Sequence, residues 1–411
     1  GFFVGNFLGA EALAAVNLLM PYFALLFGIA LMLGVGGSVK ASIYIGKSDH
    51  QSASQLFSQI LLIVVLITSV AIPLSLIFSE SLFASLGANP ELYPLMQAYF
   101  EILCISFVMQ LSCLVIYYFV RADNQPELGM RALMLGAVIN ILLDALFIYG
   151  LGWGIEGAAW ATLIAQATQL LYISSYFFSG KNNLRFTRLQ KNWSEVGFSA
   201  FNGFSEFINE ISIGIVILVF HWIISGEAGV DGIAAFSVVN YLIYISLMVY
   251  YGIIDAMHVL LSQNFGAGRK DRVVAFMKMA TASIASLSIA LVIMLHVFQA
   301  EIVGFFLEDG AAQARILTEE FVSVIWPIFL FNGFNVLICA YLTSAEKAMH
   351  SSIIALLRSL ILPIGFVIAL AALLPGIGFI YAVPIAEALT FAFALIFFVY
   401  FRPSALPAHV H

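Results

Sequence analysis

The stretch GAVINILLDALFIYG, residues 136–150, is apolar except for Asn140, Asp144 and the hydroxyl group of Tyr149. Asn140 and Asp144 are four residues apart, so on a helix they share one face, one turn from each other. If this helix lies in lipid, a charged carboxylate there costs at least about 2.5–3.5 kcal/mol on insertion scales. An acid kept in a membrane at that cost is expected to have a function.

The composition indicates that the helix does lie in a membrane. Of 411 residues, 62% are hydrophobic and 9% are charged, whereas a typical soluble domain has roughly 25% charged residues. Apolar runs of about 20 residues recur along the whole chain, and each can cross a hydrocarbon core of roughly 30 Å. The sequence therefore predicts an all-α polytopic membrane protein, and the formal charge of −7 argues against nucleic acid as a partner.

The three cysteines all lie inside apolar runs, at Cys104, Cys113 and Cys339. They form no disulfide framework and have no metal-ligand spacing. The sequence predicts neither a metal site nor a cofactor.

Apolar runs between polar residues predict eleven complete spans, and residues 1–8 (GFFVGNFL) are a partial one. The complete spans are expected near residues 14–45, 55–79, 92–120, 130–150, 157–179, 197–224, 232–265, 273–300, 316–343, 352–374 and 378–401. Lysine and arginine accumulate in cytoplasmic loops. All of them except Arg315 fall on one side of this arrangement if Lys40, Lys278 and Arg358 extend toward the nearest cytoplasmic loops. Even-numbered spans are therefore expected to end on the cytoplasmic side, and both termini of the full-length protein are expected in the cytoplasm.

The second half of the chain resembles the first at a constant offset in numbering. LGAEALAAV (8–16) matches AGVDGIAAF (228–236), and SIYIGKSD (42–49) matches SQNFGAGR (262–269). An offset of one six-span unit predicts a parallel repeat with a pseudo-two-fold axis and a cleft between the lobes. We expect an N-lobe at residues 1–179, a basic cytoplasmic linker at 180–195, a C-lobe at 196–402 and a tail at 403–411. The same comparison predicts that most of the first of twelve spans, about 25 residues by the length rule, precedes Gly1.

The chain resembles the MATE (multidrug and toxic compound extrusion) transporters over essentially its whole length. The segments that carry the resemblance are FFVGNFLGAEALAAV, RADNQP, NILLD and SQNFGAGRKDRV. The resemblance implies a monomeric secondary antiporter of the plasma (cell inner) membrane, not an enzyme, that exports organic cations and amphipathic drugs in exchange for protons or sodium. The family's first span resembles Asp-x-x-Phe-Val-Gly, which would put its Asp immediately ahead of Gly1.

Depth estimates from about 1.5 Å of rise per residue place Asp144, Thr162 and Tyr99 in one layer of the outer half of the N-lobe, with Asn140 one turn deeper. In proton-coupled members of the family the matching Asn and Asp carry the coupling site. The resemblance thus implies a coupling role for Asn140 and Asp144. Thr162 and Tyr99 are included in this candidate site because their expected depth in the membrane matches that of Asp144. A lone intramembrane Asn or Thr is more often a hydrogen-bonding contact between helices, whereas an intramembrane carboxylate usually marks an ion pathway.

The C-lobe offers a possible second site, formed by Glu206, Glu210, Asp255, His258 and Glu387. Glu206 and Asp255 both lie roughly 15 Å from the cytoplasmic ends of their helices, so they can share a layer. A structural hydrogen-bonded cluster is the alternative interpretation, and for His258 a satisfied buried imidazole is expected.

Two other functions remain open. A lipid-linked oligosaccharide flippase of the same fold needs cationic side chains for the pyrophosphate, and the sequence predicts no lysine or arginine in mid-membrane. An intramembrane prenyltransferase needs paired aspartates near a cytoplasmic mouth to hold Mg²⁺, and Asp144 is solitary. The acid favours proton-coupled export of cationic or neutral drugs through an apolar cleft, with sodium as the other possible coupling ion.

Overall fold

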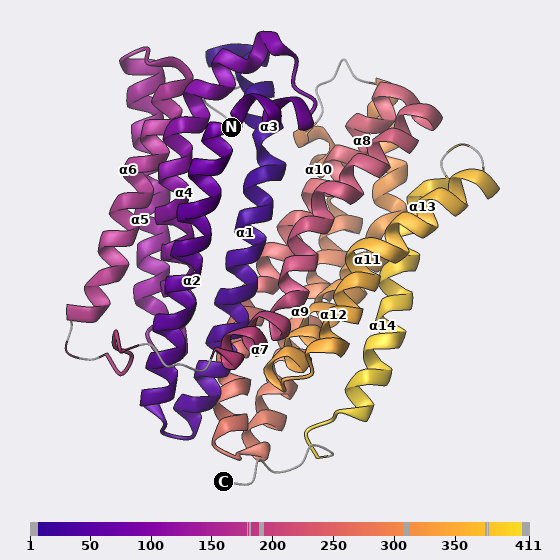
Figure 1. Ribbon diagram of the computed structural model, residues 1–411. Helices are drawn as coiled ribbons and strands as arrows, with labels where there is room; N and C mark the ends of the chain where they lie inside the picture. The colour runs from indigo at the N-terminus through magenta and orange to yellow at the C-terminus, as the bar shows by residue number, and fades with distance from the viewer. Residues whose placement is uncertain are drawn as a thin grey trace. The chain divides into compact units, whose positions relative to one another are not determined.

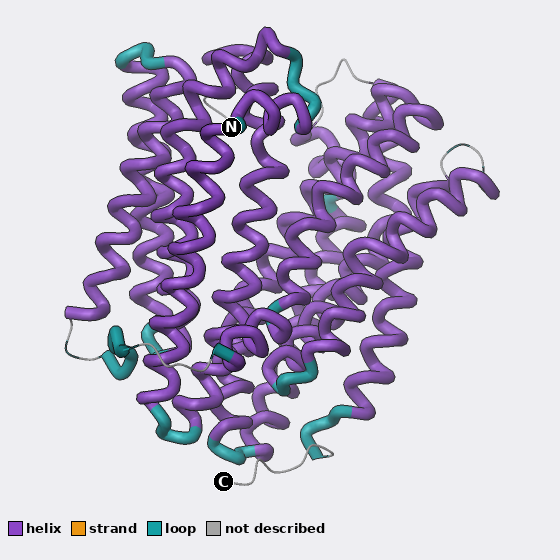
Figure 2. The backbone as a smooth tube through the Cα atoms, viewed as in Figure 1, coloured by secondary structure: helices purple, strands orange, loops and turns teal. Residues whose placement is uncertain are grey.

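The computed structural model describes residues 7–178, 180, 182–188, 193–306, 312–374, 376 and 378–404. This part of the chain consists of helices joined by short loops (Figure 2). It forms two compact units, Gly1–Gly203 and Phe204–His411. Most of the predicted partial span, Lys181 and Lys191 of the linker, and residues 405–411 of the tail lie outside the described residues.

The first unit is built around α4, which packs against α1, α2, α5 and α6 (Figure 1). Asp49 caps the start of α2, since its Oδ1 accepts a hydrogen bond from the Ser52 amide at 3.0 Å. The unit contains α1 (Gly9–Gly46), α2 (His50–Ile77), α3 (Ser79–Ser85), η2 (Pro90–Leu92), α4 (Tyr93–Ala122), α5 (Pro126–Asp144), η3 (Ala145–Gly150), α6 (Gly154–Ser174), η4 (Ser175–Phe178) and α7 (Ser194–Asn202).

The second unit is built around α11, which packs against α8, α9, α12 and α14. Its first helix, α8, continues through a break at Gly229, where φ is 62° and ψ is −153°. The unit contains α8 (Phe204–Gly266), α9 (Lys270–Val297), α10 (Gln299–Phe306), α11 (Ala312–Ser344), α12 (Ala348–Leu356), η5 (Leu357–Ile361), α13 (Leu362–Leu373), η6 (Gly378–Tyr381) and α14 (Ala382–Tyr400).

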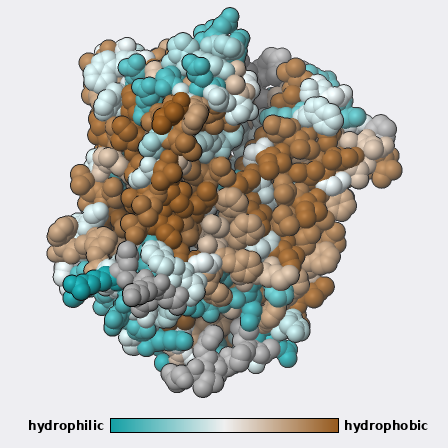
Figure 3. All heavy atoms as spheres, viewed as in Figure 1, coloured by the Kyte–Doolittle hydropathy of each residue, from teal (hydrophilic) through white to brown (hydrophobic). Residues whose placement is uncertain are grey.

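Large apolar side chains cover the outward faces of these helices. On the face shown in Figure 3, hydrophobic residues cover the middle of the helices and hydrophilic residues gather toward their ends. Leu171 is 75% exposed and Trp222 is 77% exposed. Such surfaces suit lipid rather than water, so the prediction of a polytopic, all-helical membrane protein is confirmed.

Within the described residues, nine helices are long and apolar enough to cross a membrane. One of the nine is α8, whose 63 residues include the break at Gly229. That break lies between the predicted spans 197–224 and 232–265. The helix α6 is not among the nine, although it overlaps the predicted span 157–179.

The two units repeat the same helix boundaries. Both α2 and α9 have 28 residues, and they begin at His50 and Lys270, which the repeat pairs with each other. Residues with left-handed backbone conformations are separated by the same offset in numbering as the two halves of the sequence repeat. They are Gly9 (φ 86°) and Gly229 (φ 62°), and Ser48 (φ 62°) and Gly268 (φ 69°). At nearly the same interval, Asn124 (φ 61°) and Glu346 (φ 56°) end α4 and α11 in the same way.

The boundary between the units lies at Gly203, whereas the sequence assigns residues from 196 onward to the C-lobe. The reason is close packing of α7 against α1. A Cβ atom on Gly36 would lie 1.9 Å from the Ser199 carbonyl oxygen, and one on Gly203 would lie 2.0 Å from the Met32 carbonyl oxygen. Only glycine permits the two backbones to approach this closely.

Candidate functional site

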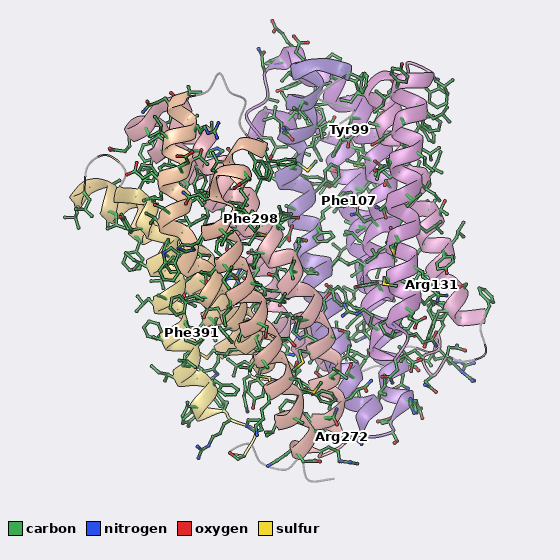
Figure 4. The ribbon with its side chains drawn as sticks, turned by 180° about the vertical axis from the view of Figure 1, so that it is seen from behind. Tyr99, Phe107, Arg131, Arg272, Phe298 and Phe391 are labelled. Atoms are coloured by element: carbon green, nitrogen blue, oxygen red, sulfur yellow. The ribbon has the colours of Figure 1, made fainter. Side chains whose placement is uncertain are left out.

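The candidate site of the first unit lies where α4, α5 and α6 pack together. Asn140 and Asp144 occupy the last turns of α5, and the π-helical segment η3 begins immediately after Asp144. Thr162 lies on α6, and Tyr99 lies on α4, which Figure 4 shows with Phe107 on the same helix. Short π-helical segments inside helices are frequent at functional sites.

The structure brings the four predicted residues of this site together. The Asn140 Nδ2 atom donates to Thr162 Oγ1 at 3.4 Å, and Thr162 Oγ1 donates to the Ala158 carbonyl oxygen at 3.0 Å. Tyr99 is 7% exposed, and its phenol lies within electrostatic range of the Asp144 carboxylate. Three neighbouring helices thus contribute polar groups to one site.

The Asp144 carboxylate is incompletely satisfied. Its Oδ1 atom is buried and has no hydrogen-bond partner among the described residues. Buried polar atoms almost always have a partner, so an exception calls for an explanation such as a bound ion, water or proton. An ionised carboxylate only accepts hydrogen bonds, and a protonated one can also donate. The arrangement can therefore hold either a proton or a small cation.

Sequence reasoning missed Gln166. It lies on α6 one turn after Thr162, and its Oε1 atom is a second buried acceptor without a partner in the described part of the chain. The spacing of four residues from Thr162 was a signal that could have found it. One turn before Asn140, a Cβ atom on Gly136 would lie 2.8 Å from Gln169 Oε1, so glycine allows α5 and α6 to pack closely there.

In the second unit, Glu206, Asp255 and Glu387 belong to one electrostatically coupled cluster around Arg358. Glu206 interacts with Asp255, Arg358 and Glu210. The Arg358 Nε atom lies 3.8 Å from Glu387 Oε1, with side chains 10% and 7% exposed. These five residues come from α8, η5 and α14, so only tertiary packing brings them together.

The expected extension of Arg358 toward a cytoplasmic loop is wrong. Arg358 lies ten residues into the continuous helix that begins at Ala348, about 15 Å along it, and its guanidinium is buried against Glu387. The prediction that no arginine lies in mid-membrane is therefore wrong as well. The acid on α14 accounts for the difference, because a buried cation needs an opposite charge nearby.

His258 lies against a serine of α11. Its side chain is buried, and its Nδ1 atom lies 3.5 Å from Ser344 Oγ. In the described residues no group of three or more histidine, cysteine, aspartate or glutamate side chains is arranged to hold a metal ion.

Comparison with solved structures shows which fold this is. A MATE protein crystallised in complex with MaL6 superimposes with a TM-score of 0.90 at 22% identity, covering 98% of this chain and 91% of that one. An outward-facing multidrug resistance MATE family transporter of the MOP superfamily gives a TM-score of 0.89 at 22% identity, covering 98% and 90%. The chain therefore has the MATE fold.

Curated relatives and a family model agree with the fold. The multidrug export protein MepA of Staphylococcus aureus strain N315 is 25% identical over 394 residues, which cover 94% of this chain and 85% of MepA. MepA of Staphylococcus saprophyticus is 24% identical over 372 residues, covering 89% and 81%. The family model MatE matches residues 1–146 and 206–368. Since these ranges make up most of the chain, this multi-pass membrane protein belongs to the MatE family of MATE transporters.

Proposed function

We propose that this protein exports multiple drugs by alternating access, in antiport with protons. The family and the names of the MepA relatives support a role in multidrug export. The substrates we propose are organic cations and amphipathic drugs. An apolar cleft would give loose selectivity, because apolar contacts discriminate weakly between shapes.

The observation that carries the proposal of proton coupling is the Asp144 carboxylate. It lies within a candidate span, and its Oδ1 atom is buried without a partner among the described residues. Asn140, which is bonded to Thr162, lies one turn earlier on the same helix, and Tyr99 lies within electrostatic range. When Asp144 is charged, its Oδ1 atom is a buried acceptor that lacks a hydrogen bond from the described residues. A proton at Asp144 removes the charge and supplies a donor, which both relieves the burial of charge and satisfies a neighbouring acceptor.

Protonation of Asp144 would then set the conformation of the first unit. With the carboxyl neutral, α5 and α6 can pack more tightly around Asn140 and Thr162, and drug is released outward. Proton release to the cytoplasm restores the charged form as the next drug binds. Drug and proton need not touch, since they need only favour opposite conformations.

The membrane arrangement that we propose has twelve spans in the full-length protein, as two six-helix lobes in a parallel repeat. The equal lengths of α2 and α9 and the paired left-handed residues support the repeat. The lobes, linker and tail are proposed at the boundaries given above. The distribution of basic residues supports cytoplasmic termini in the plasma membrane. We propose a monomer as the functional unit.

The test is drug efflux from proteoliposomes under separately imposed proton and sodium gradients. The parent protein should respond to the proton gradient, and Asp144→Asn should lose proton-driven efflux while folding and inserting normally. Asparagine mimics the shape and neutrality of the protonated carboxyl group. The matched control is Glu127→Gln on the same helix, whose side chain is 76% exposed and ion-paired with Arg131, and it should retain efflux.

Two outcomes would contradict this proposal. Efflux by Asp144→Asn equal to that of the parent would make Asp144 a contact between helices rather than a coupling residue. Efflux driven by the sodium gradient alone would assign sodium as the coupling ion and leave multidrug export intact.

The buried arginine of the second unit favours one alternative, a flippase for pyrophosphate-linked lipids. Arg358 supplies a mid-membrane cation, which such a cargo needs. Its charge is matched by Glu387, however, so the cluster carries no free positive charge for a pyrophosphate. Strong preference for one lipid pyrophosphate over all drug cations in the same liposomes would support the flippase.

A further inference from the structure

In the described part of the second unit, several partly or fully buried acids interact with one another and with the cation Arg358. Glu206 interacts electrostatically with Asp255, Glu210 and Arg358, and Glu387 pairs with Arg358. Arg358 also interacts with the Tyr251 side chain. Carboxylates are costly inside a membrane protein unless a cation or a proton compensates them. In this unit the compensating cation is part of the chain.

Oxygen atoms of the kind that bind alkali cations lie on residues that contact Glu387 or Ser359, the chain neighbour of Arg358. Asn335 Nδ2 donates to Glu387 Oε2 at 2.7 Å and to the Glu387 carbonyl oxygen at 2.9 Å, while Asn335 Oδ1 is buried without a partner among the described residues. On α8, Asn209 Oδ1 accepts from Ser359 Oγ at 2.7 Å. Carboxylate, amide and phenol oxygens are hard ligands that suit hard cations.

The backbone places the guanidinium among these oxygens. Arg358 is the second residue of η5, a π-helical segment between α12 and α13. A π-helical turn adds a residue to the turn and so changes the face on which the following side chains lie. Together with α14, which contributes Glu387, this segment holds the guanidinium 3.8 Å from an acid of another helix.

We propose that Arg358 is a tethered cation that occupies the position of a coupling ion in the second unit and excludes sodium from it. The residue thereby determines ion specificity. With the guanidinium in place, a sodium ion would approach a like charge and find Glu387 already paired. Without it, Glu387 loses its cationic partner, and the amide oxygen of Asn335, which has no partner among the described residues and whose Nδ2 atom contacts Glu387, is a second hard ligand, so negative charge and oxygen atoms remain at this position. The inference builds on the proposed antiport and concerns which ion drives it.

The test is equilibrium binding of radioactive sodium to purified protein in detergent, with lithium as the competitor. Every variant carries Asp144→Asn, so that the site of the first unit contributes nothing to the signal. Arg358→Met should gain sodium affinity by at least about tenfold, because a like charge close to the carboxylates is removed. The gain should vanish in Arg358→Met combined with Glu387→Gln. The matched control Lys278→Met removes an exposed cation of the same unit and should bind no more sodium than the background.

A second variant keeps the test decisive if Arg358→Met does not fold. Arg358→Lys retains the charge at neutral pH, so it should bind no sodium there. Lysine can lose its proton as the pH rises, whereas arginine stays protonated in proteins. Sodium binding should therefore appear at high pH in Arg358→Lys and remain absent in the variant that keeps Arg358.

The proposal is overturned if folded Arg358→Met, or Arg358→Lys across the pH range, binds no sodium. It is also overturned if protein with Arg358 intact binds sodium in a way that Glu387→Gln abolishes. Neither result bears on Asp144, whose role is tested by efflux in the proteoliposome experiment.

Discussion

Residues 182–188, near the start of the linker, form a segment that we call the strap. Asp123 holds the strap against the first unit through hydrogen bonds. Its side chain is buried, and it accepts hydrogen bonds from the Tyr176 hydroxyl group, from the Asn183 amide at 3.0 Å and from Asn183 Nδ2 at 2.8 Å. The Leu184 amide in turn donates to Tyr176 Oη at 3.1 Å. Asp123→Ala would leave the three donors that it binds without their acceptor.

The size of the effect follows from these contacts. A hydrogen bond to a charged group contributes about 1.5–3 kcal/mol, and three bonds that share one carboxylate do not add fully. Leaving a buried donor without its acceptor costs about 1–3 kcal/mol, and we expect Asp123→Ala, which does so at three donors, to cost about 3 kcal/mol for release of the strap. A loss of about 3 kcal/mol from the free energy that holds the strap in place raises the fraction of molecules with a detached strap roughly a hundredfold.

Limited trypsin digestion measures this release directly. Arg185 lies in the strap, and its backbone amide donates to Ser54 Oγ at 3.2 Å, so cleavage after Arg185 requires the strap to leave the first unit. The cleavage rate should follow the open fraction when opening is fast relative to cleavage. Mass spectrometry identifies the cut, and tryptophan fluorescence on heating confirms that the helices remain folded.

Matched variants separate the contact from a general loss of stability. Tyr176→Phe removes one donor to Asp123 and the acceptor of the Leu184 amide but leaves both Asn183 bonds to the carboxylate, so its cleavage rate should rise less than that of Asp123→Ala. Glu127→Ala removes an exposed acid paired with Arg131, and exposed pairs contribute only about 0–1 kcal/mol. If Asp123→Ala is cut after Arg185 no faster than Glu127→Ala, the carboxylate does not hold the strap and this reasoning is refuted.

Three further predictions concern the backbone and helix ends of the first unit. Gly36→Ala should disrupt the packing of α7 against α1 and lower the thermal unfolding temperature in detergent, since its Cβ would lie 1.9 Å from the Ser199 carbonyl oxygen; an unchanged temperature would contradict the close approach. Ser48→Gly should raise the free energy of unfolding by about 0.5–1 kcal/mol, because Ser48 has φ 62° and left-handed backbone strains a residue with a Cβ atom; denaturant titration that finds a loss would refute this. Asp49→Ala should lower that free energy by about 1 kcal/mol through loss of the α2 cap. Burial acts to raise the pKa of Asp49, but the hydrogen bonds from Ser52 outweigh it and hold the pKa below its usual value. The stabilisation from this cap is therefore present above the unfolded pKa of aspartate and is lost as the pH falls through the lower folded value, so the parent and Asp49→Ala should converge in stability at acidic pH.

Several features of this protein could be predicted from the sequence because they depend on local properties of the chain. Hydropathy and length identify membrane helices, since a lipid core demands apolar runs with internally satisfied backbones. The spacing of four residues places Asn140 and Asp144 on one face of α5 without reference to any other helix. The internal repeat can be recognised in the sequence, and helix ends and left-handed residues lie at matching positions in its two halves.

Contacts between helices were decided only by the tertiary structure. Arg358 and Glu387 lie on different helices, and their ion pair depends on how each helix is rotated about its own axis. The π-helical segment η5 changes that rotation. The apolar residues around Arg358 give no sequence signal that predicts a π-helical segment there. The same holds for Asp123 and Asn183, which are 60 residues apart, and for Gln166, whose Oε1 atom is buried because of the way α6 packs against its neighbours. Hydropathy determines that a helix lies in the membrane, whereas side-chain packing determines which of its faces meets which partner.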